Sequence, residues 1–184
     1  DYYWSSASEI FKTNDGGTTW QSIWHGNYQG EHFEKMFFVN EKTGYASRYA
    51  YLYKTDDSAK TWVQVFNEDY KWIAAINFPS AKTGYIVGGS GLMKRTVDSG
   101  KTWTDVTPTG LSAWSKISLI EASHYDPAVA YAAVDRSRLD DQAPYLYRTR
   151  DYGSSWQLIT NGIAAHAFLR GIREDTQKKD LLFA

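Results

Sequence analysis

Three aspartates in one polar stretch, residues 135–144, are the candidates for catalysis in this chain: Asp135, Asp140 and Asp141. Glycoside hydrolysis usually needs two carboxyl groups roughly 5–10 Å apart, one acting as acid and the other as base or nucleophile. The alternative is a solvated loop, because polar loops rich in Arg and Asp are common. Clustered carboxylates also suit a calcium ion, although this spacing does not match an EF-hand loop.

Other catalytic patterns are missing from the sequence. The chain has no cysteine, which excludes disulfides and thiol catalysis. It also lacks a serine nucleophile elbow, an H-E-x-x-H zinc motif, a phosphate loop and a dinucleotide fingerprint. The four histidines, His25, His32, His124 and His166, show no metal-ligand spacing. The sequence therefore predicts no metal and no cofactor.

Aromatic residues are abundant, at 16% of 184 residues, with eight Trp and fourteen Tyr. One interpretation is packing between repeats. The other is a binding face for a protein or a glycan, because aromatic rings with polar edges suit both partners. The candidate binding residues lie in predicted loops and are Tyr28, Tyr49, Tyr70, Trp114, Arg136 and Arg138.

One eight-residue motif, called the phrase below, occurs four times. Its repetition sets the positions of the strands and loops that carry these side chains. Its pattern is T-x-D-x-(G/A)-x-(T/S)-W, and the copies begin at Thr13, Thr55, Thr96 and Thr149. The aspartates of successive copies are 42, 41 and 53 positions apart. This period is typical of one four-stranded propeller blade per repeat.

Each copy lies between two short runs of aromatic and β-branched residues, which predicts the turn of a β-hairpin. The Asp can accept hydrogen bonds from its own turn, and the glycine permits a positive φ. The Trp supplies an apolar face for packing between blades. Ala59 replaces this glycine in the second copy, at a cost of roughly 1 kcal/mol if φ is positive there. The residues predicted to be structural are Asp15, Trp20, Asp57, Trp62, Asp98, Trp103, Asp151 and Trp156.

The sequence predicts a single all-β propeller domain over residues 1–184, with four-stranded antiparallel blades and four blade equivalents. The chain opens with the last two strands of a blade and ends with the first two, predicted at 167–173 and 181–184. The ends could close one shared blade, the chain could be part of a larger propeller, or two copies could form a larger ring as a homodimer. The predicted units are about 1–28 (half), 29–70, 71–110, 111–163 and 164–184 (half).

The repeated phrase resembles the Asp-box, or bacterial neuraminidase repeat. The first three copies, with their Lys-Thr-Gly-Tyr turns at 42–45 and 82–85, resemble photosystem II assembly-factor-type propellers. Residues 118–127 and 170–175 resemble sortilin-type bacterial propellers that are often named glycosyl hydrolases. The resemblance implies an extracellular or periplasmic location, although the chain shows no signal peptide. It does not decide the function, since this repeat occurs in enzymes and in non-catalytic proteins.

These observations favour a non-catalytic binding or scaffold module. It would bind a protein or glycan through the loops opposite the repeated turns. The alternative is a glycoside hydrolase of sialidase or xyloglucanase type, or a fragment of one, and a third is an engineered or excised propeller without native function. The net charge of −1 gives no case for nucleic acid, and no apolar run is long enough for membrane insertion.

Overall fold

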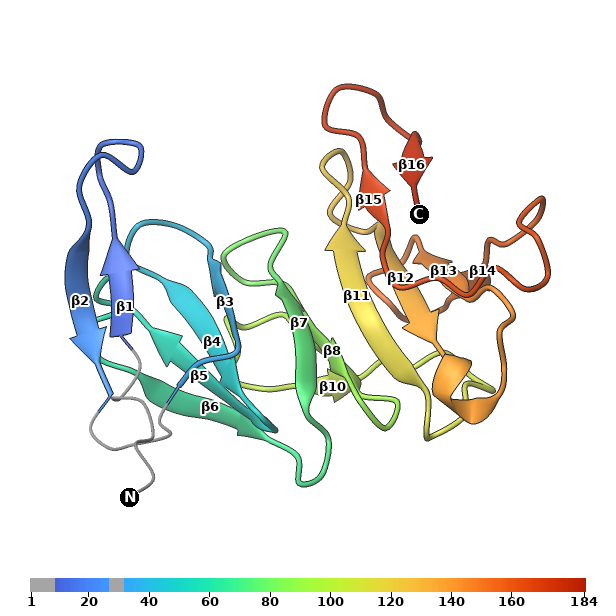
Figure 1. Cartoon of the computed structure of the whole chain (residues 1–184), viewed down its shortest axis with the longest axis horizontal. Helices are drawn as coiled ribbons and strands as arrows, with labels where there is room; N and C mark the ends of the chain where they lie inside the picture. The colour runs from blue at the N-terminus through green and yellow to red at the C-terminus, as the bar shows by residue number, and fades with distance from the viewer. Residues whose placement is uncertain (1–8, 27–31) are drawn as a thin grey trace, which may run out of the picture.

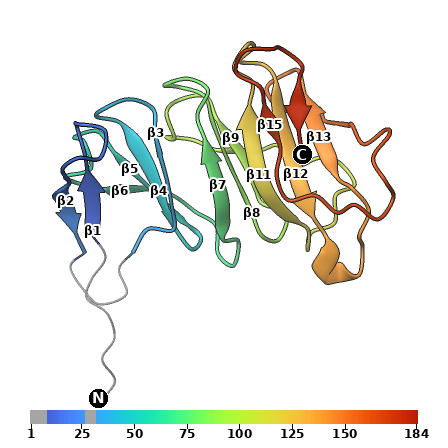
Figure 2. The ribbon, with the colours of Figure 1, turned by 45° about the horizontal axis from the view of Figure 1, so that its top comes forward.

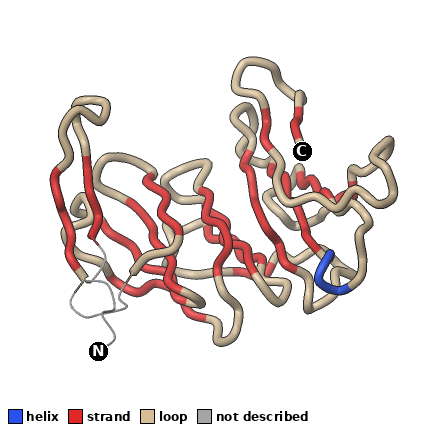
Figure 3. The backbone as a smooth tube through the Cα atoms, in the orientation of Figure 1, coloured by secondary structure: helices blue, strands red, loops and turns tan. Residues whose placement is uncertain are grey.

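The computed structural model describes residues 9–26 and 32–184, which consist almost entirely of strands and loops (Figure 3). The described residues form three four-stranded sheets and two two-stranded sheets. The first small sheet pairs β1 (Glu9–Lys12) with β2 (Gln21–His25), and the last pairs β15 (Arg173–Glu174) with β16 (Leu182–Phe183). Tyr28, one of the predicted binding residues, lies outside the described residues.

Each four-stranded sheet is an antiparallel blade whose strands are neighbours in sequence. This arrangement confirms the predicted fold class, an all-β propeller of four-stranded blades. The first complete blade contains β3 (Lys35–Phe38), β4 (Gly44–Arg48), β5 (Tyr51–Thr55) and β6 (Val63–Asn67). The second contains β7 (Ile73–Asn77), β8 (Gly84–Gly88), β9 (Met93–Thr96) and β10 (Thr104–Asp105). The third contains β11 (Lys116–Ala122), β12 (Ala130–Asp135), β13 (Leu146–Thr149) and β14 (Gln157–Leu158).

The five sheets follow one another along an open arc (Figures 1 and 2). The pair β1–β2 lies at one end and the pair β15–β16 at the other, and the two pairs form separate sheets. Closure of a shared blade within one chain, which was one of the three predicted arrangements, is therefore not the arrangement in this structure. Within the described part of the chain, no helix has the length and apolar character that a membrane span needs.

The arc has two distinct faces, which lie at the upper and lower edges of Figure 1. We call the face with the four repeated turns the turn face. There each turn of a complete blade donates a backbone hydrogen bond to the first turn of its own blade, as Ser99 N does to Lys82 O at 2.9 Å. The opposite face, which we call the loop face, carries the loops between second and third strands and those between blades. It also carries the short helix η1 (Ser137–Leu139).

The repeated turns share one set of hydrogen bonds. In the third copy, Asp98 Oδ1 accepts from the Thr102 backbone N–H at 2.9 Å and from the Thr96 hydroxyl at 2.8 Å, and Asp98 Oδ2 accepts from the Thr102 hydroxyl at 2.6 Å. The equivalent bonds form around Asp15, Asp57 and Asp151. Bonds to the ionised carboxylate favour the charged form, so the pKa of Asp98 falls to about 2.

The glycine position of the phrase has a positive φ in all four copies. Gly100 has φ 82° and Ala59 has φ 69°. We predicted strain at Ala59 if φ is positive there, and φ is positive. Ala59 is also fully buried. A methyl group in the left-handed region costs about 1–2 kcal/mol, part of which its burial offsets.

Two of the tryptophans that close the turns, Trp103 and Trp156, contact the preceding blade. Trp103 packs edge-on against Phe66 of the preceding blade at a ring distance of 5.7 Å. The Trp156 indole N–H donates to the Val106 carbonyl at 2.7 Å. Trp20 closes the turn of the first pair, and its side chain is exposed. The apolar core thus lies between neighbouring blades, as in any propeller whose blades stack face to face.

The tail differs from its prediction. We predicted a first strand over 167–173, but only Arg173 and Glu174 are in β15, and the residues before them are irregular. A strand forms only where a partner strand can accept its backbone hydrogen bonds. The partner here, β16, pairs with Arg173 and Glu174 alone, so the preceding residues have no ladder to join.

Candidate functional site

The candidate catalytic residue Asp135 is buried at the loop face and fully engaged. Its Oδ1 accepts from the backbone N–H of Ser137 at 2.9 Å and from the Ser137 hydroxyl at 2.6 Å, and its Oδ2 accepts from Arg170 Nε at 2.9 Å. Burial raises the pKa of Asp135, but these bonds outweigh burial and hold it below its usual range. Asp135 therefore links the last complete blade to the segment that leads into β15.

Asp141 is also engaged by side chains of its own loop, whereas Asp140 is exposed. Asp141 accepts from the Tyr145 hydroxyl at 2.8 Å and pairs with Arg136 at 3.0 Å, and the bond from Tyr145 is the main cause of its lowered pKa. Asp140 ends η1 with a left-handed φ of 56°. A glycosidase needs one carboxyl with a raised pKa to act as general acid. Asp135 and Asp141 instead have lowered pKa values and each binds an arginine.

Within residues 9–26 and 32–184, no three His, Cys, Asp or Glu side chains converge in a way that could hold a metal ion.

Three predicted binding residues are among the exposed aromatics of the loop face. Tyr70 is 96% exposed, Trp114 76% and Tyr49 59%. Tyr49 and Tyr70 also have positive φ values of 52° and 63°. Such a backbone is unusual for a bulky residue and persists only where the surroundings hold it, which is a common property of binding loops.

Backbone contacts between blades hold this aromatic surface together. The carbonyl of Tyr49 accepts from the N–H of Ile73 at 2.8 Å, which places the Tyr49 loop beside Trp72 of the next blade. Lys116 Nζ lies 5.1 Å from the Trp72 ring centre. A Cβ on Gly89 would come within 2.1 Å of the Trp72 indole nitrogen, so glycine is required there. The Tyr49 loop, Trp72 of the next blade and Lys116 of the blade after it are therefore neighbours on the loop face.

The two predicted binding arginines behave differently. Arg136 bonds to Asp141 at 3.0 Å and to the Tyr145 hydroxyl at 3.1 Å, so it is used within its own loop. Arg138 lies in η1 and is exposed on the loop face. Arg138 is thus open to a partner, whereas Arg136 serves to hold the inserted loop.

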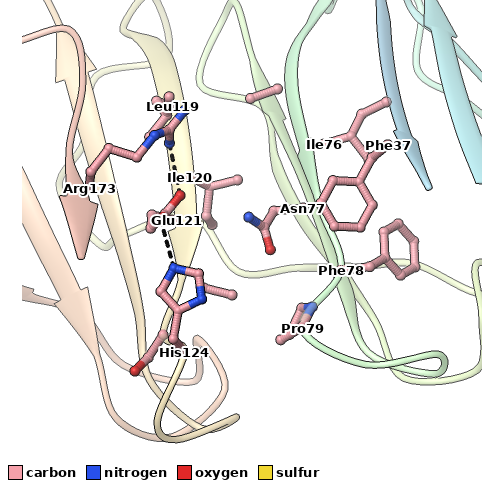
Figure 4. Close-up of a pocket in the computed structure, with 13 residues that line it drawn as sticks. Phe37, Ile76, Asn77, Phe78, Pro79, Leu119, Ile120, Glu121, His124 and Arg173 are labelled. Atoms are coloured by element: carbon pink, nitrogen blue, oxygen red, sulfur yellow. Dashed lines mark hydrogen bonds and ion pairs between the residues drawn. The ribbon is translucent and has the colours of Figure 1, made fainter. Parts of the chain in front are cut away.

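A cleft of about 570 Å³ lies between β7 and β11, and the sequence did not predict it (Figure 4). Four of its lining residues occupy one equivalent position in four successive first strands. The residues at this position pair in register with Tyr45, Tyr85, Tyr131 and Phe183 of the second strands. These four lining residues are Phe37, Asn77, Glu121 and Arg173.

Charged and polar groups gather at one side of this cleft. The Glu121 side chain is only 10% exposed, and its Oε2 accepts from Arg173 Nη1 at 2.8 Å. His124 Nε2 lies 3.5 Å from Glu121 Oε1. Figure 4 shows Asn77 extending toward the cleft from the opposite strand. Since His124 and Pro79 follow the ends of β11 and β7, this cleft opens toward the turn face.

The polar residues of this cleft can be found in the sequence only after the repeats have been aligned with one another. Asn77 stands eight residues before Tyr85, and Phe37 stands eight residues before Tyr45. Glu121 and Arg173 stand ten residues before Tyr131 and Phe183. Repetition places equivalent positions of successive blades beside one another, so the change from Phe37 to Asn77, Glu121 and Arg173 shows where polar side chains gather.

Comparisons with known proteins support the fold. No protein-family model matches the chain, and no curated protein matches it. Among solved structures, YCF48 from Cyanidioschyzon merolae matches 92% of this chain with a TM-score of 0.63 at 17% identity. A GH74 enzyme from Niastella koreensis matches 83% with a TM-score of 0.64 at 18% identity. YCF48 bound to D1 peptide matches 68% with a TM-score of 0.53 at 23% identity.

The matched region is only part of each of these proteins. It covers 58% of the C. merolae YCF48 chain, 38% of the peptide-bound YCF48 chain and 26% of the GH74 enzyme. At these identities the similarity concerns the propeller fold, which serves both binding proteins and enzymes.

Proposed function

We propose that this propeller is a non-catalytic binding module that takes a protein segment on its loop face. The observation that carries the proposal is the exposure of three aromatic side chains on that face, Tyr49, Tyr70 and Trp114, in loops of successive blades. Tyr and Trp contribute a large share of binding energy at protein interfaces, because a rigid ring buries much area at little entropic cost.

The surface is also held in place before a partner arrives. The bond from Ile73 to the Tyr49 carbonyl fixes one loop, and the close fit of Gly89 against Trp72 fixes another. Preorganisation reduces the ordering cost of association. Arg138, exposed on η1, adds a positive charge at the edge of this face, where charge steers encounter more than it adds affinity.

The comparisons are compatible with this proposal. A structural neighbour is YCF48 bound to D1 peptide, so a propeller of similar fold binds a peptide. The alternative proposal, a glycosidase, has support from the similarity to GH74 enzymes. Against it stand the lowered pKa values of Asp135 and Asp141 and their engagement with arginines.

A phage-displayed random peptide library tests the proposal directly. Peptides are selected on the full chain and their affinities compared on Tyr49→Ala, Trp114→Ala and Tyr125→Ala. Tyr125 is an exposed aromatic beside the turn face and is the matched control. We expect Tyr49→Ala and Trp114→Ala to weaken binding by about tenfold or more and Tyr125→Ala to leave it unchanged.

Equal binding to all three variants would reject the loop face as the binding surface. The glycosidase alternative is tested with xyloglucan and a panel of chromogenic glycosides, and turnover that is lost in Asp135→Ala would replace the binding proposal. Assembly of two copies into a larger ring and an extracellular or periplasmic location remain predictions from the sequence.

A further inference from the structure

We infer that the cleft between β7 and β11 is a second binding site, separate from the loop face, and that it takes a carboxylate carried on a small apolar group. The cleft opens toward the opposite face from Tyr49 and Trp114, and none of its lining residues belongs to the aromatic surface. Its volume of about 570 Å³ lies within the usual range for small-ligand pockets, about 300–1,000 Å³.

The most exposed polar group of the cleft is a hydrogen-bond donor. Arg173 is 61% exposed and uses Nη1 for its bonds to Glu121 and to the Ile172 carbonyl. A guanidinium has five N–H groups in a fixed plane, so one edge can hold Glu121 while another meets a ligand. The Asn77 amide adds a donor and an acceptor, and His124, 44% exposed, adds an imidazole.

The acidic member of the cluster is largely withdrawn from the ligand space. Glu121 is 10% exposed, with Arg173 on one oxygen and His124 near the other. It orients the two side chains and balances the charge of the guanidinium. A ligand entering the cleft therefore meets the guanidinium and the imidazole before it meets the carboxylate, and this order favours an anionic acceptor over a cation.

Apolar side chains also line the cleft (Figure 4). Phe37 and Leu119 are partly exposed, whereas Ile76 and Ile120 are buried. An inorganic anion would leave the apolar side chains of the cleft exposed to water. An aliphatic carboxylate would cover them with its alkyl chain while its carboxylate bonds to Arg173. The chemistry is shared by a free organic acid and by the terminal carboxylate of an apolar peptide.

Isothermal titration of the full chain with hexanoate tests the site, with hexanamide as the neutral control. We expect saturable binding of hexanoate and binding of hexanamide that is weaker by about tenfold or more, because the amide loses the charge-assisted bonds. The peptide acetyl-Leu-Leu, with a free or an amidated carboxyl end, separates the two sources of the group. Tighter binding of the free-acid peptide than of hexanoate assigns the site to a peptide end, and weaker binding assigns it to a free acid.

Two variants locate the binding in the cleft. Arg173→Met removes the guanidinium but keeps an apolar side chain, and Arg138→Met makes the same change on the loop face as the control. Since Arg173→Met also leaves Glu121 without its main partner, Asn77→Phe provides a variant outside the ion pair. It places in β7 the residue that β3 has at the equivalent position, and it narrows the cleft.

Loss of hexanoate binding in Arg173→Met and Asn77→Phe, with full binding in Arg138→Met, is the expected result. Equal affinity for hexanoate and hexanamide, or unchanged binding in both cleft variants, would overturn the inference. Circular dichroism of each variant confirms that the chain is folded. The loop-face variants Tyr49→Ala and Trp114→Ala should leave hexanoate binding intact, so failure of the peptide proposal would not count against this site.

Discussion

The hydroxyl of Tyr45 donates a hydrogen bond of 2.8 Å to the backbone carbonyl of Ser99, which belongs to the repeated turn of the next blade. The Tyr45 ring also stacks on Phe78 with ring centres 3.8 Å apart. Tyr85 occupies the same position one blade later and is equally buried, yet its hydroxyl has no hydrogen-bond partner among the described residues. Burial raises the pKa of Tyr85 to about 12. The tyrosine at this position thus packs between blades in both cases, but only Tyr45 also forms a hydrogen bond to the next blade.

Removing the two hydroxyls should therefore have opposite consequences. We expect Tyr45→Phe to lower the free energy of unfolding by about 1 kcal/mol, because it breaks a bond and leaves the Ser99 carbonyl unpaired. Tyr85→Phe should be neutral or stabilising, because it removes a buried polar atom without a partner. Urea denaturation of the two variants measures both effects. Equal destabilisation by the two changes would contradict this account.

The glycines with positive φ allow strain to be separated from packing. Gly100 has φ 82° and a Cβ there would lie 3.1 Å from the Tyr45 ring, whereas Gly110 has φ 83° and open space around it. We expect Gly110→Ala to cost about 1–2 kcal/mol from backbone strain alone and Gly100→Ala to cost more. The difference in urea midpoint between the variants measures the packing contribution. An equal loss in the two variants would show that the Tyr45 ring gives way easily.

The aspartates of the repeated turns should make stability depend on acid pH. The pKa of Asp98 is about 2 in the folded chain against an ordinary value of 3.8. A lowered folded pKa contributes stability above the unfolded value, and this contribution is lost as the pH falls from about 4 to about 2. Asp98→Asn should melt below the wild-type chain near neutral pH, and the gap should narrow in that window. A gap of constant size down to about pH 2 would argue against the linkage.

Asp135 is expected to matter for stability rather than for turnover. Asp135→Asn weakens the contacts with Arg170 and Ser137 and should cost about 1 kcal/mol, since Arg170 is exposed and only part of the pairing energy is realised. Asp140→Asn is the control, because Asp140 is exposed and asparagine tolerates its left-handed φ of 56°. Thermal melting of both variants shows the difference. Identical melting would remove the structural role assigned to Asp135.

The blade architecture was predictable because its determinants are local and repeated. The phrase around Asp57 or Asp98 contains its own hydrogen-bond donors and acceptors, so the hairpin can be read from eight residues. The first and second strands of complete blades follow from turns such as Lys82–Tyr85. The strand predicted over 167–173 was wrong because strand length depends on the partner, and β16 offers a partner to only two residues.

The candidate site was less accessible to sequence reasoning. Carboxylates in one loop looked like a catalytic group, but Asp135 and Asp141 are engaged by arginines, one of which, Arg170, is 35 positions away. The cleft around Glu121 depends on contacts between blades, with Arg173 lying 52 positions further along the chain. Such pairs are fixed by the stacking of blades, which no local pattern encodes.

The open arc has a consequence for cooperativity. In the part of the chain that the structure describes, the main contacts between sheets join neighbours, such as β3 with β7 and β7 with β11. The molecule should therefore behave as a one-dimensional array in which stability is a sum of unit and interface contributions. Unfolding should then begin at the outer pairs, β1–β2 and β15–β16, each of which packs on one neighbouring sheet among the described residues, and the central blade β7–β10 should open last. Amide hydrogen exchange would show this as a gradient of protection that peaks at the middle of the arc, so the inferred cleft beside β7 lies where the chain is most rigid.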